Sequence, residues 1–149
     1  MSKGSFKIST QGFKSLEKRL EGMSKSVVQE VSDVIDNHIF EINKEQIANV
    51  TRQNAVKTGF LRGSNKFEVS QPTYKEVFNN ANYAAFVEFG TGRKVSVPKE
   101  LNAYARQFKG WSMGRQISLP ARPFFFAPFF KRRTAMLRDI VKVLQKFGK

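Results

Sequence analysis

Residues 24–54, SKSVVQEVSDVIDNHIFEINKEQIANVTRQN, carry apolar side chains at the spacing of an α-helix. The apolar positions fall on one face and the carboxylates on the others, which is typical of a helix that packs one side against a core. The stretch therefore predicts one long helix from Ser24 to about Asn54. The apolar positions are Val27, Val31, Val34, Ile35, Ile42 and Val50, and the acidic positions are Glu30, Asp33, Asp36, Glu41 and Glu45.

Shorter elements flank this helix on both sides. Residues 12–22 predict a short amphipathic helix. Residues 66–70 and 74–79 predict two strands that form a hairpin around Gln71-Pro72-Thr73. Residues 83–89 predict another short helix, since the asparagine before it can cap a helix and the glycine after it can end one.

The C-terminal part is irregular before it ends in a helix. Glycines and prolines punctuate residues 91–123, where one helix is predicted within 98–108, and the whole segment predicts a functional loop or arm. The last helix is predicted to begin near Phe129. One of its sides is apolar, and another carries basic residues at i, i+4 spacing, namely Arg138, Lys142 and Lys146.

The elements together predict an α+β fold: a long N-terminal helix and a C-terminal helix packed on a small antiparallel sheet, with an extended loop or arm. We expect a single domain over residues 1–149, because a chain of this length supports one hydrophobic core. Residues 12–90 would hold the helices and the sheet, 91–119 the loop or arm, and 120–149 a phenylalanine-rich entry and the C-terminal helix.

The composition excludes several kinds of site. The chain has no cysteine, which excludes disulfides, cysteine-based zinc sites and thiol nucleophiles and favours an intracellular folding compartment. The N-terminal residues lack the apolar core of a signal peptide, and no run approaches about 18 apolar residues. We therefore expect a protein that is neither exported by that route nor inserted in a membrane.

Positive charge is concentrated in the second part of the chain. The formal net charge is +14, and residues 91–149 hold 14 basic and 2 acidic side chains, against 12 basic and 10 acidic in residues 1–90. Such a one-sided field favours a polyanion or an acidic protein surface as partner, without choosing between them.

The sequence offers little for catalysis. His38, the only histidine, shares i, i+3, i+7 spacing with Glu41 and Glu45, but such a cluster is far more often a solvated helix face than a metal site. No nucleophile elbow is present, and the Gly-Thr-Gly run at 90–92 lacks the strand-to-helix context of a phosphate loop. We predict no enzyme, no metal and no cofactor.

The basic half has two interpretations. In the first, its cations neutralise DNA phosphates, and Arg93, Lys94, Arg138, Lys142 and Lys146 are the candidates to face DNA. In the second, the cations on the last helix are only the wet face of an amphipathic helix. No helix-turn-helix or zinc-finger signature indicates sequence-specific recognition.

The stretch PARPFFFAPFFKRR, residues 120–133, places five phenylalanines directly before three consecutive cations. Leaving all five rings in water would forfeit about 1.5–3 kcal/mol for each, so some must be buried. Since prolines interrupt a regular helix, we expect some rings to point into the core and others toward a partner. The alternative is that all five are core residues. The predicted assembly interface comprises Arg122, Pro123, Phe124, Phe125, Phe126, Phe129, Phe130 and Trp111.

Four motifs, in order, resemble one family. They are TGFLRGS at 58–64, NYAAFVEFGTGR at 82–93, VPKELNAYARQFKG at 97–110 and PARPFFFAPFF at 120–130. Each is weak alone, but in this order they are similar to the tail-completion, or head-tail joining, proteins of tailed bacteriophages, over residues from about 12 to 147.

The resemblance implies a structural protein of the virion neck that forms a closed ring, of six or twelve copies, around the DNA channel. Its partners would be its own copies, the head connector and the tail tube or terminator, with non-specific DNA contact in the channel, and it would assemble in the host cytoplasm. A free-standing non-specific DNA-binding protein and a tail terminator or minor tail protein remain as alternatives. The motif residues, with roles in fold and assembly, are Thr58, Gly59, Leu61, Arg62, Tyr83, Glu88, Phe89, Gly90 and Thr91, together with Arg122, Pro123 and Phe124.

Overall fold

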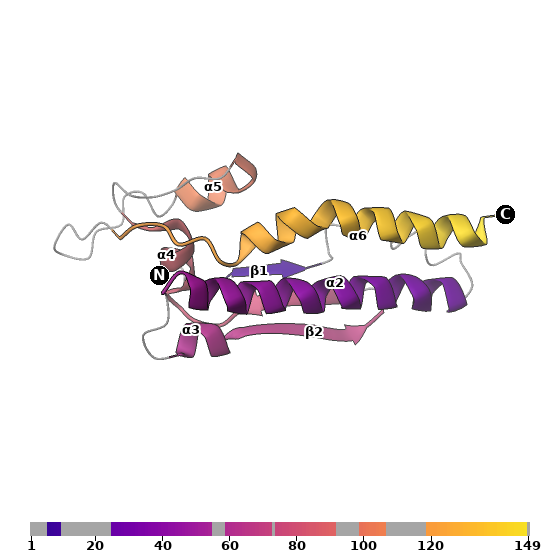
Figure 1. Ribbon diagram of the computed structural model, residues 1–149, viewed down its shortest axis with the longest axis horizontal. Coiled ribbons are helices and arrows are strands. Elements are labelled where there is room, and N and C mark those ends of the chain that lie inside the picture. The colour runs from indigo at the N-terminus through magenta and orange to yellow at the C-terminus, as the bar shows by residue number, and fades with distance from the viewer. Residues whose placement is uncertain are drawn as a thin grey trace.

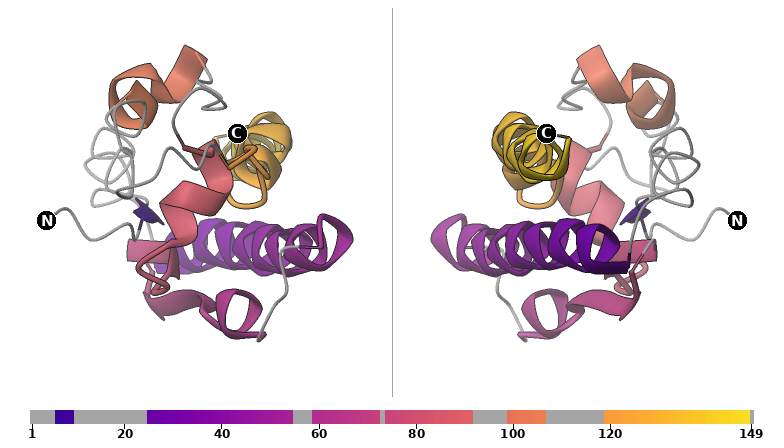
Figure 2. Two further views of the ribbon diagram at one scale, coloured as in Figure 1. Left: turned by 90° about the vertical axis from the view of Figure 1, so that its left-hand side faces the viewer. Right: turned by 90° about the vertical axis from the view of Figure 1, so that its right-hand side faces the viewer.

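The computed structural model describes residues 6–9, 25–54, 59–72, 74–91, 99–106 and 119–148 (Figure 1). Two long helices lie side by side, and a small sheet and several short helices lie around them (Figures 1 and 2). In chain order the elements are β1 (Phe6–Ser9), α2 (Lys25–Arg52), α3 (Phe60–Gly63), β2 (Asn65–Gln71), β3 (Tyr74–Asn79), α4 (Ala84–Phe89), the 3-10 turn η3 (Lys99–Leu101), α5 (Asn102–Ala105) and α6 (Phe126–Phe147).

The long helix α2 is confirmed almost to its ends. Its buried residues follow the predicted apolar face, and only Val34 of that set remains partly exposed. The face extends through Ile39, which is also buried, and it contacts both the sheet and α6. The helix thus provides the surface on which the other elements assemble.

The sheet has three antiparallel strands in the order β1-β3-β2. The predicted hairpin is confirmed as β2 and β3, with Gln71 opposite Tyr74 at its turn. The sequence did not indicate β1, which pairs with the far edge of β3 and places Phe6 opposite Asn79. Four residues give too short an alternation to mark a strand, and this pairing joins segments distant in the sequence.

A buried cation ties the sheet to α2. Lys75 of β3 is only 1% exposed, and its Nζ lies 2.7 Å from Oδ1 of Asp36 on α2. The same Nζ donates to the carbonyl of Val69 on β2. Since an unpaired buried ammonium is strongly destabilising, this pairing is a requirement of the helix–sheet packing.

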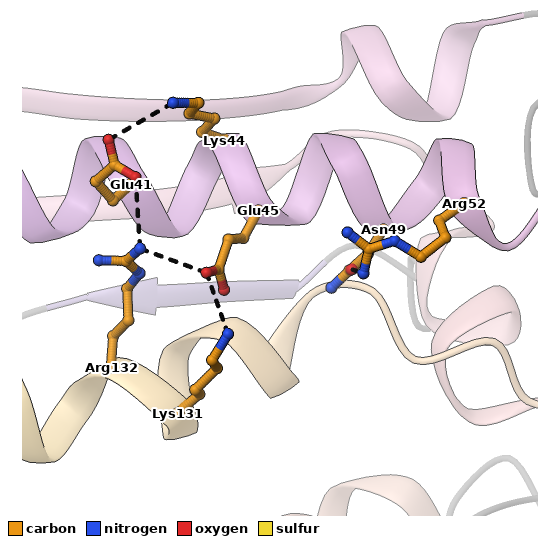
Figure 3. Close-up of polar contacts among 7 residues, drawn as sticks. All are labelled: Glu41, Lys44, Glu45, Asn49, Arg52, Lys131 and Arg132. Carbon is orange, nitrogen blue, oxygen red and sulfur yellow. Dashed lines mark hydrogen bonds and ion pairs between the residues drawn. The ribbon is translucent and has the colours of Figure 1, made fainter.

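The second long helix, α6, runs antiparallel to α2, and ion pairs cross between the two. Lys146 near the end of α6 pairs with Glu30 near the start of α2, at 3.0 Å. Toward the start of α6, Arg132 lies 3.4 Å from both Glu41 and Glu45 (Figure 3). The carboxylates on α2 are thus largely matched by cations on α6.

The phenylalanine-rich stretch is mostly core. Phe124 and Phe125 are 0% exposed and Phe126 is 8% exposed, whereas Phe129 and Phe130 are half-buried. Phe126 stacks on Phe89 of α4, with ring centroids 5.9 Å apart. This burial corrects the expectation that Phe124, Phe125 and Phe126 belong to the assembly interface.

The start of α6 also differs from the prediction. The helix begins at Phe126, three residues before the predicted start, and it includes Pro128. A proline in the first helical turn is tolerated because the N–H groups there have no acceptor within the helix. Pro128 therefore does not interrupt α6, and the segment before the helix takes its irregular path only up to Phe125.

Two predicted segments lie wholly or partly outside the described residues. The helix predicted for 12–22 lies outside them, as does most of the predicted loop or arm at 91–119. Within that arm the structure describes η3 and α5, which confirm a short helical region within 98–108. Tyr104 of α5 contacts Phe89 edge-on, with ring centroids 5.8 Å apart, so this part of the arm packs against α4.

Replacement of Phe125 by alanine tests the core assignment. Because the ring is fully buried, we expect Phe125→Ala to lower the free energy of unfolding by about 3–5 kcal/mol, measured by urea denaturation. The matched control is Phe40→Ala, which removes a ring that is 53% exposed and should cost less than about 1 kcal/mol. Equal, small effects of the two substitutions would contradict the assignment.

Candidate functional site

The most developed polar site lies where α4 meets the start of α6. Glu88, on the last turn of α4, is buried, and its carboxylate accepts three backbone N–H groups. Oε2 accepts from Phe124 at 2.6 Å and from Phe125 at 2.9 Å, and Oε1 accepts from Phe126 at 3.2 Å. One side chain thus satisfies the amide donors at the start of α6, 36 to 38 residues further along the chain.

The local sequence explains why Glu88 reaches this position. The helix α4 ends at Gly90, whose φ of 76° and ψ of −173° belong to a conformation that only glycine adopts without strain. Gly90 donates its N–H to the carbonyl of Phe86, closing the last turn. The chain then leaves α4 in the direction of residues 119–123.

A two-bond clasp follows directly. The N–H of Thr91 donates to the carbonyl of Leu119 at 3.0 Å, and the N–H of Leu119 donates to Oγ1 of Thr91 at 2.9 Å. Three residues later, the N–H of Arg122 donates to the carbonyl of Val87 at 2.8 Å. The two ends of segment 92–118 are thereby held together on α4.

The C-terminal end of α2 completes the site. Gln46, fully buried, donates Nε2 to the carbonyl of Phe125 at 2.9 Å, and Gln53 donates Nε2 to the carbonyl of Pro123. The guanidinium of Arg122 donates to the carbonyl of Asn54 at 3.1 Å. We call this site the junction: the α4 end at 86–91, the segment 119–126, and Gln46, Gln53 and Asn54.

Burial and hydrogen bonding act in opposite directions on the Glu88 carboxyl. Its removal from water raises the pKa above the usual 4.5, and the hydrogen bonds from Phe125, Phe124 and Phe126 reduce that rise because they favour the charged form. All three bonds use carboxylate oxygens as acceptors, which is the geometry of the ionised group. In the junction the carboxylate of Glu88 is thus occupied by backbone donors that join α4 to the start of α6.

The structure brings part of the motif set together. Glu88, Gly90 and Thr91 meet Arg122, Pro123 and Phe124 at the junction, although the two groups lie about thirty residues apart. The sequence did not indicate the glutamines. A polar Gln46 between Ile42 and Val50 on the apolar face of α2 was the available signal, because a buried amide needs a partner.

The other motif residues lie elsewhere. Gly59, with φ 75°, precedes α3, and Leu61 is buried while Arg62 is exposed. The Leu61 carbonyl accepts from Asn79 at 3.1 Å, which joins α3 to β3. Phe89 is a core residue, and Tyr83 is 38% exposed. Thr58, Arg93, Lys94 and Trp111 lie outside the described residues.

The basic stripe on α6 is partly neutralised within the chain. Lys146 pairs with Glu30, and Lys142 pairs with Asp139 at 3.0 Å. Arg138 is exposed and forms no ion pair with any residue that the structure describes. The stripe therefore carries less free charge than its sequence indicates.

The residues considered for metal binding have other partners. Nε2 of His38 lies 3.1 Å from Oδ2 of Asp139, while Glu41 and Glu45 both face Arg132. Across the described ranges, no group of three or more histidine, aspartate or glutamate side chains is arranged to hold a metal ion. Among the helices that the structure describes, none is long and apolar enough to cross a membrane.

Comparison with known proteins gives one match. The family model described as "HK97-gp10_like: Bacteriophage HK97-gp10, putative tail-component" matches residues 14–90, more than half of the chain. No curated protein and no solved structure matches the chain. The matched region includes α2, the β2–β3 hairpin and α4, and it ends at Gly90, within the α4 side of the junction.

Glu88→Gln tests the junction without changing its shape. The amide retains one oxygen but turns an NH₂ group toward a backbone donor, so we expect a loss of about 2–4 kcal/mol in the free energy of unfolding at pH 7. The matched control is Glu100→Gln at an exposed position, which should change stability by less than about 0.5 kcal/mol. Equal effects on stability at the two positions would contradict the structural role assigned to the junction.

The pH dependence follows from the same carboxyl group. Because its pKa is raised on folding, the folded chain binds this proton more tightly than the unfolded chain. Lowering the pH from 7 toward 4.5 should therefore increase the free energy of unfolding of wild type relative to that of Glu88→Gln. This gain should be lost as the pH is raised through the raised pKa of Glu88. Urea denaturation of both proteins at several pH values measures the difference in their free energies of unfolding. A difference that falls on acidification would contradict the assignment.

Proposed function

Because the chain belongs to the HK97-gp10-like family of bacteriophage tail components, we propose that it joins the head connector to the tail as a structural protein of the virion neck. Membership makes it a structural component of the tail that interacts with other phage proteins. The proposal adds its position, its assembly as a closed ring of six or twelve copies around the DNA channel, and a role without catalysis. It also places assembly in the host cytoplasm, before the protein enters the virion.

The observation that carries this proposal is the junction. A joining protein must hold partner-binding segments on a body that keeps its shape, and the junction fixes the arm and α6 to the same short helix. Both ends of segment 92–118 are clasped at Thr91 and Leu119. This segment could then reach a neighbouring subunit or ring while the body stays unchanged.

Charge supports a location near DNA. Residues 91–149 carry 14 basic and 2 acidic side chains, and a channel through which DNA passes favours such a surface. Non-specific contact with DNA is part of the proposal. Burial reduces the predicted interface set. Phe124, Phe125 and Phe126 support the fold, and the remaining candidates for partner contact are Arg122, Pro123, Phe129, Phe130 and the undescribed Trp111.

Deletion of the gene from its phage tests the position. We expect lysates with DNA-filled heads beside separate tails of normal length, counted by electron microscopy. The control is wild-type protein supplied from a plasmid, which should restore joined particles. Joined, infectious virions without the protein would overturn the proposal, and headless tails of abnormal length would favour the tail terminator or minor tail alternative.

A free-standing DNA-binding protein is the alternative of another class, favoured by the charge alone. If the neck proposal holds, the isolated subunit should bind duplex DNA only at the non-specific level, with Kd of about 10⁻⁴–10⁻⁶ M at physiological salt. Fluorescence anisotropy over a salt series measures this. Arg138→Glu should weaken binding and reduce the salt slope, with Glu100→Gln as control. Nanomolar binding would favour the alternative.

A further inference from the structure

The helix α6 presents a second face, away from α2. Two apolar side chains one turn apart, Leu137 and Val141, are 37% and 48% exposed. Arg133 lies one turn before Leu137 in the same i, i+4 row, and Arg138 and Lys142 lie in the adjacent row. We call Arg133, Leu137, Arg138, Val141 and Lys142 the outer face of α6.

The outer face is distinct from the inner face of α6, which packs against α2. The inner face buries Met136 and Ile140 and places cations opposite α2 carboxylates. Figures 1 and 2 show α6 lying on α2 with no described helix or strand over the far side of its C-terminal half. Leu137 and Val141 thus form an apolar pair that the described fold leaves in water.

The cations of the outer face are not neutralised like those of the inner face. Arg133 and Arg138 are exposed and form no ion pair with any residue in the described ranges, whereas Lys142 has Asp139. The carboxylates nearest to α6 are already occupied, because Glu30 and Glu41 pair with its inner cations. Because no described carboxylate pairs with Arg133 or Arg138, an acidic surface that binds this face belongs to another molecule.

A second copy of this chain supplies that charge poorly. Each copy carries a net charge of +14, which disfavours a second copy at this cationic face, so contacts within the proposed ring would use other faces. Of its carboxylates, Glu30, Glu41 and Glu45 are paired with α6, Asp36 with Lys75, and Glu88 is buried at the junction. The exposed Asp33 and Glu100 lie on separate elements, α2 and the 3-10 turn η3.

Nucleic acid meets only half of the requirement. Phosphates would neutralise Arg133 and Arg138, but the charged backbone offers little apolar surface to cover Leu137 and Val141. A protein surface with an apolar ridge and acidic flanks would cover the apolar pair and pair with the arginines, and arginine is enriched at protein interfaces.

We propose that the outer face of α6 binds an acidic, apolar-ridged surface of a different virion protein. The proposal rests on the proposed function, since it names the chemistry of a neighbour in the assembled particle. The Leu137–Val141 pair occupies the centre of the contact, and Arg133 and Arg138 select the acidic partner. Lys142 strengthens the field at the rim.

Photo-crosslinking tests the proposal in assembled particles. Val141 is replaced by p-benzoyl-phenylalanine in the full chain, which complements the deletion phage, and purified virions are irradiated. We expect a covalent adduct with a different virion protein, whose crosslinked peptide, identified by mass spectrometry, is rich in Asp and Glu. Adding Arg133→Glu and Arg138→Glu should reduce the adduct at least tenfold, while Arg133→Lys and Arg138→Lys should retain most of it. The probe at Phe40, exposed on α2, is the positional control.

The other outcomes overturn the proposal and identify the cause. An adduct with a second copy, a nuclease-sensitive adduct, a partner peptide without acidic residues, or no adduct in particles that contain the chain would each refute it. Absence of the chain from particles would instead refute the neck role. In that case, infected cells are irradiated before lysis, and the adducts formed by the outer face are judged by the same criteria.

Discussion

The carboxylate of Glu88 is the interaction on which the rest of the structure depends. A helix start leaves backbone N–H groups without acceptors, and usually a Ser, Thr, Asp or Asn at the capping position satisfies one of them. In α6 that position is Phe125, which is needed in the core and has no side-chain acceptor. Glu88 supplies the acceptor from α4, and its negative charge also favours the N-terminal end of the helix dipole. The sequence can therefore place three consecutive phenylalanines at a helix start.

The same interaction orients α6 on α2. With its first turn fixed by Glu88 and Gln46, α6 leaves the junction along α2, where Arg132 meets Glu41 and Glu45. Each partly exposed ion pair contributes little to stability. These pairs therefore determine how α2 and α6 are aligned more than how strongly the two helices hold together. The buried Met136 and Ile140 supply the apolar contact, and the charges exclude alternative alignments.

The spacing of apolar residues predicted the elements in which these residues repeat regularly. The long α2, the β2–β3 hairpin and the C-terminal helix all follow from spacing, because their apolar faces repeat at the period of the structure. The strand β1 is too short to carry a period. The early start of α6 was missed because Pro128 was interpreted as a helix breaker, although a first-turn proline loses no helical hydrogen bond.

The junction could be predicted in part. The motif residues Glu88, Thr91 and Arg122 were selected, but not that they meet, since their contacts join distant segments and depend on the folded path. The burial of Phe125 was likewise unpredictable from the stretch itself. Five adjacent rings indicate that some are buried, whereas the choice among them depends on where α4 and α2 lie.

The clasp at Thr91 and Leu119 also explains why segment 92–118 and the body can serve different purposes. Once the ends of a loop are held together, each doubling of its length costs only about 0.6 kcal/mol in closure entropy. Its length can then vary at little cost to the body, which contains α2, the β2–β3 hairpin and α4, the elements that the family match covers. The match ends at Gly90, where the chain enters this segment. The body covered by the match and the segment closed by the clasp are therefore separate parts of the chain, joined at the end of α4.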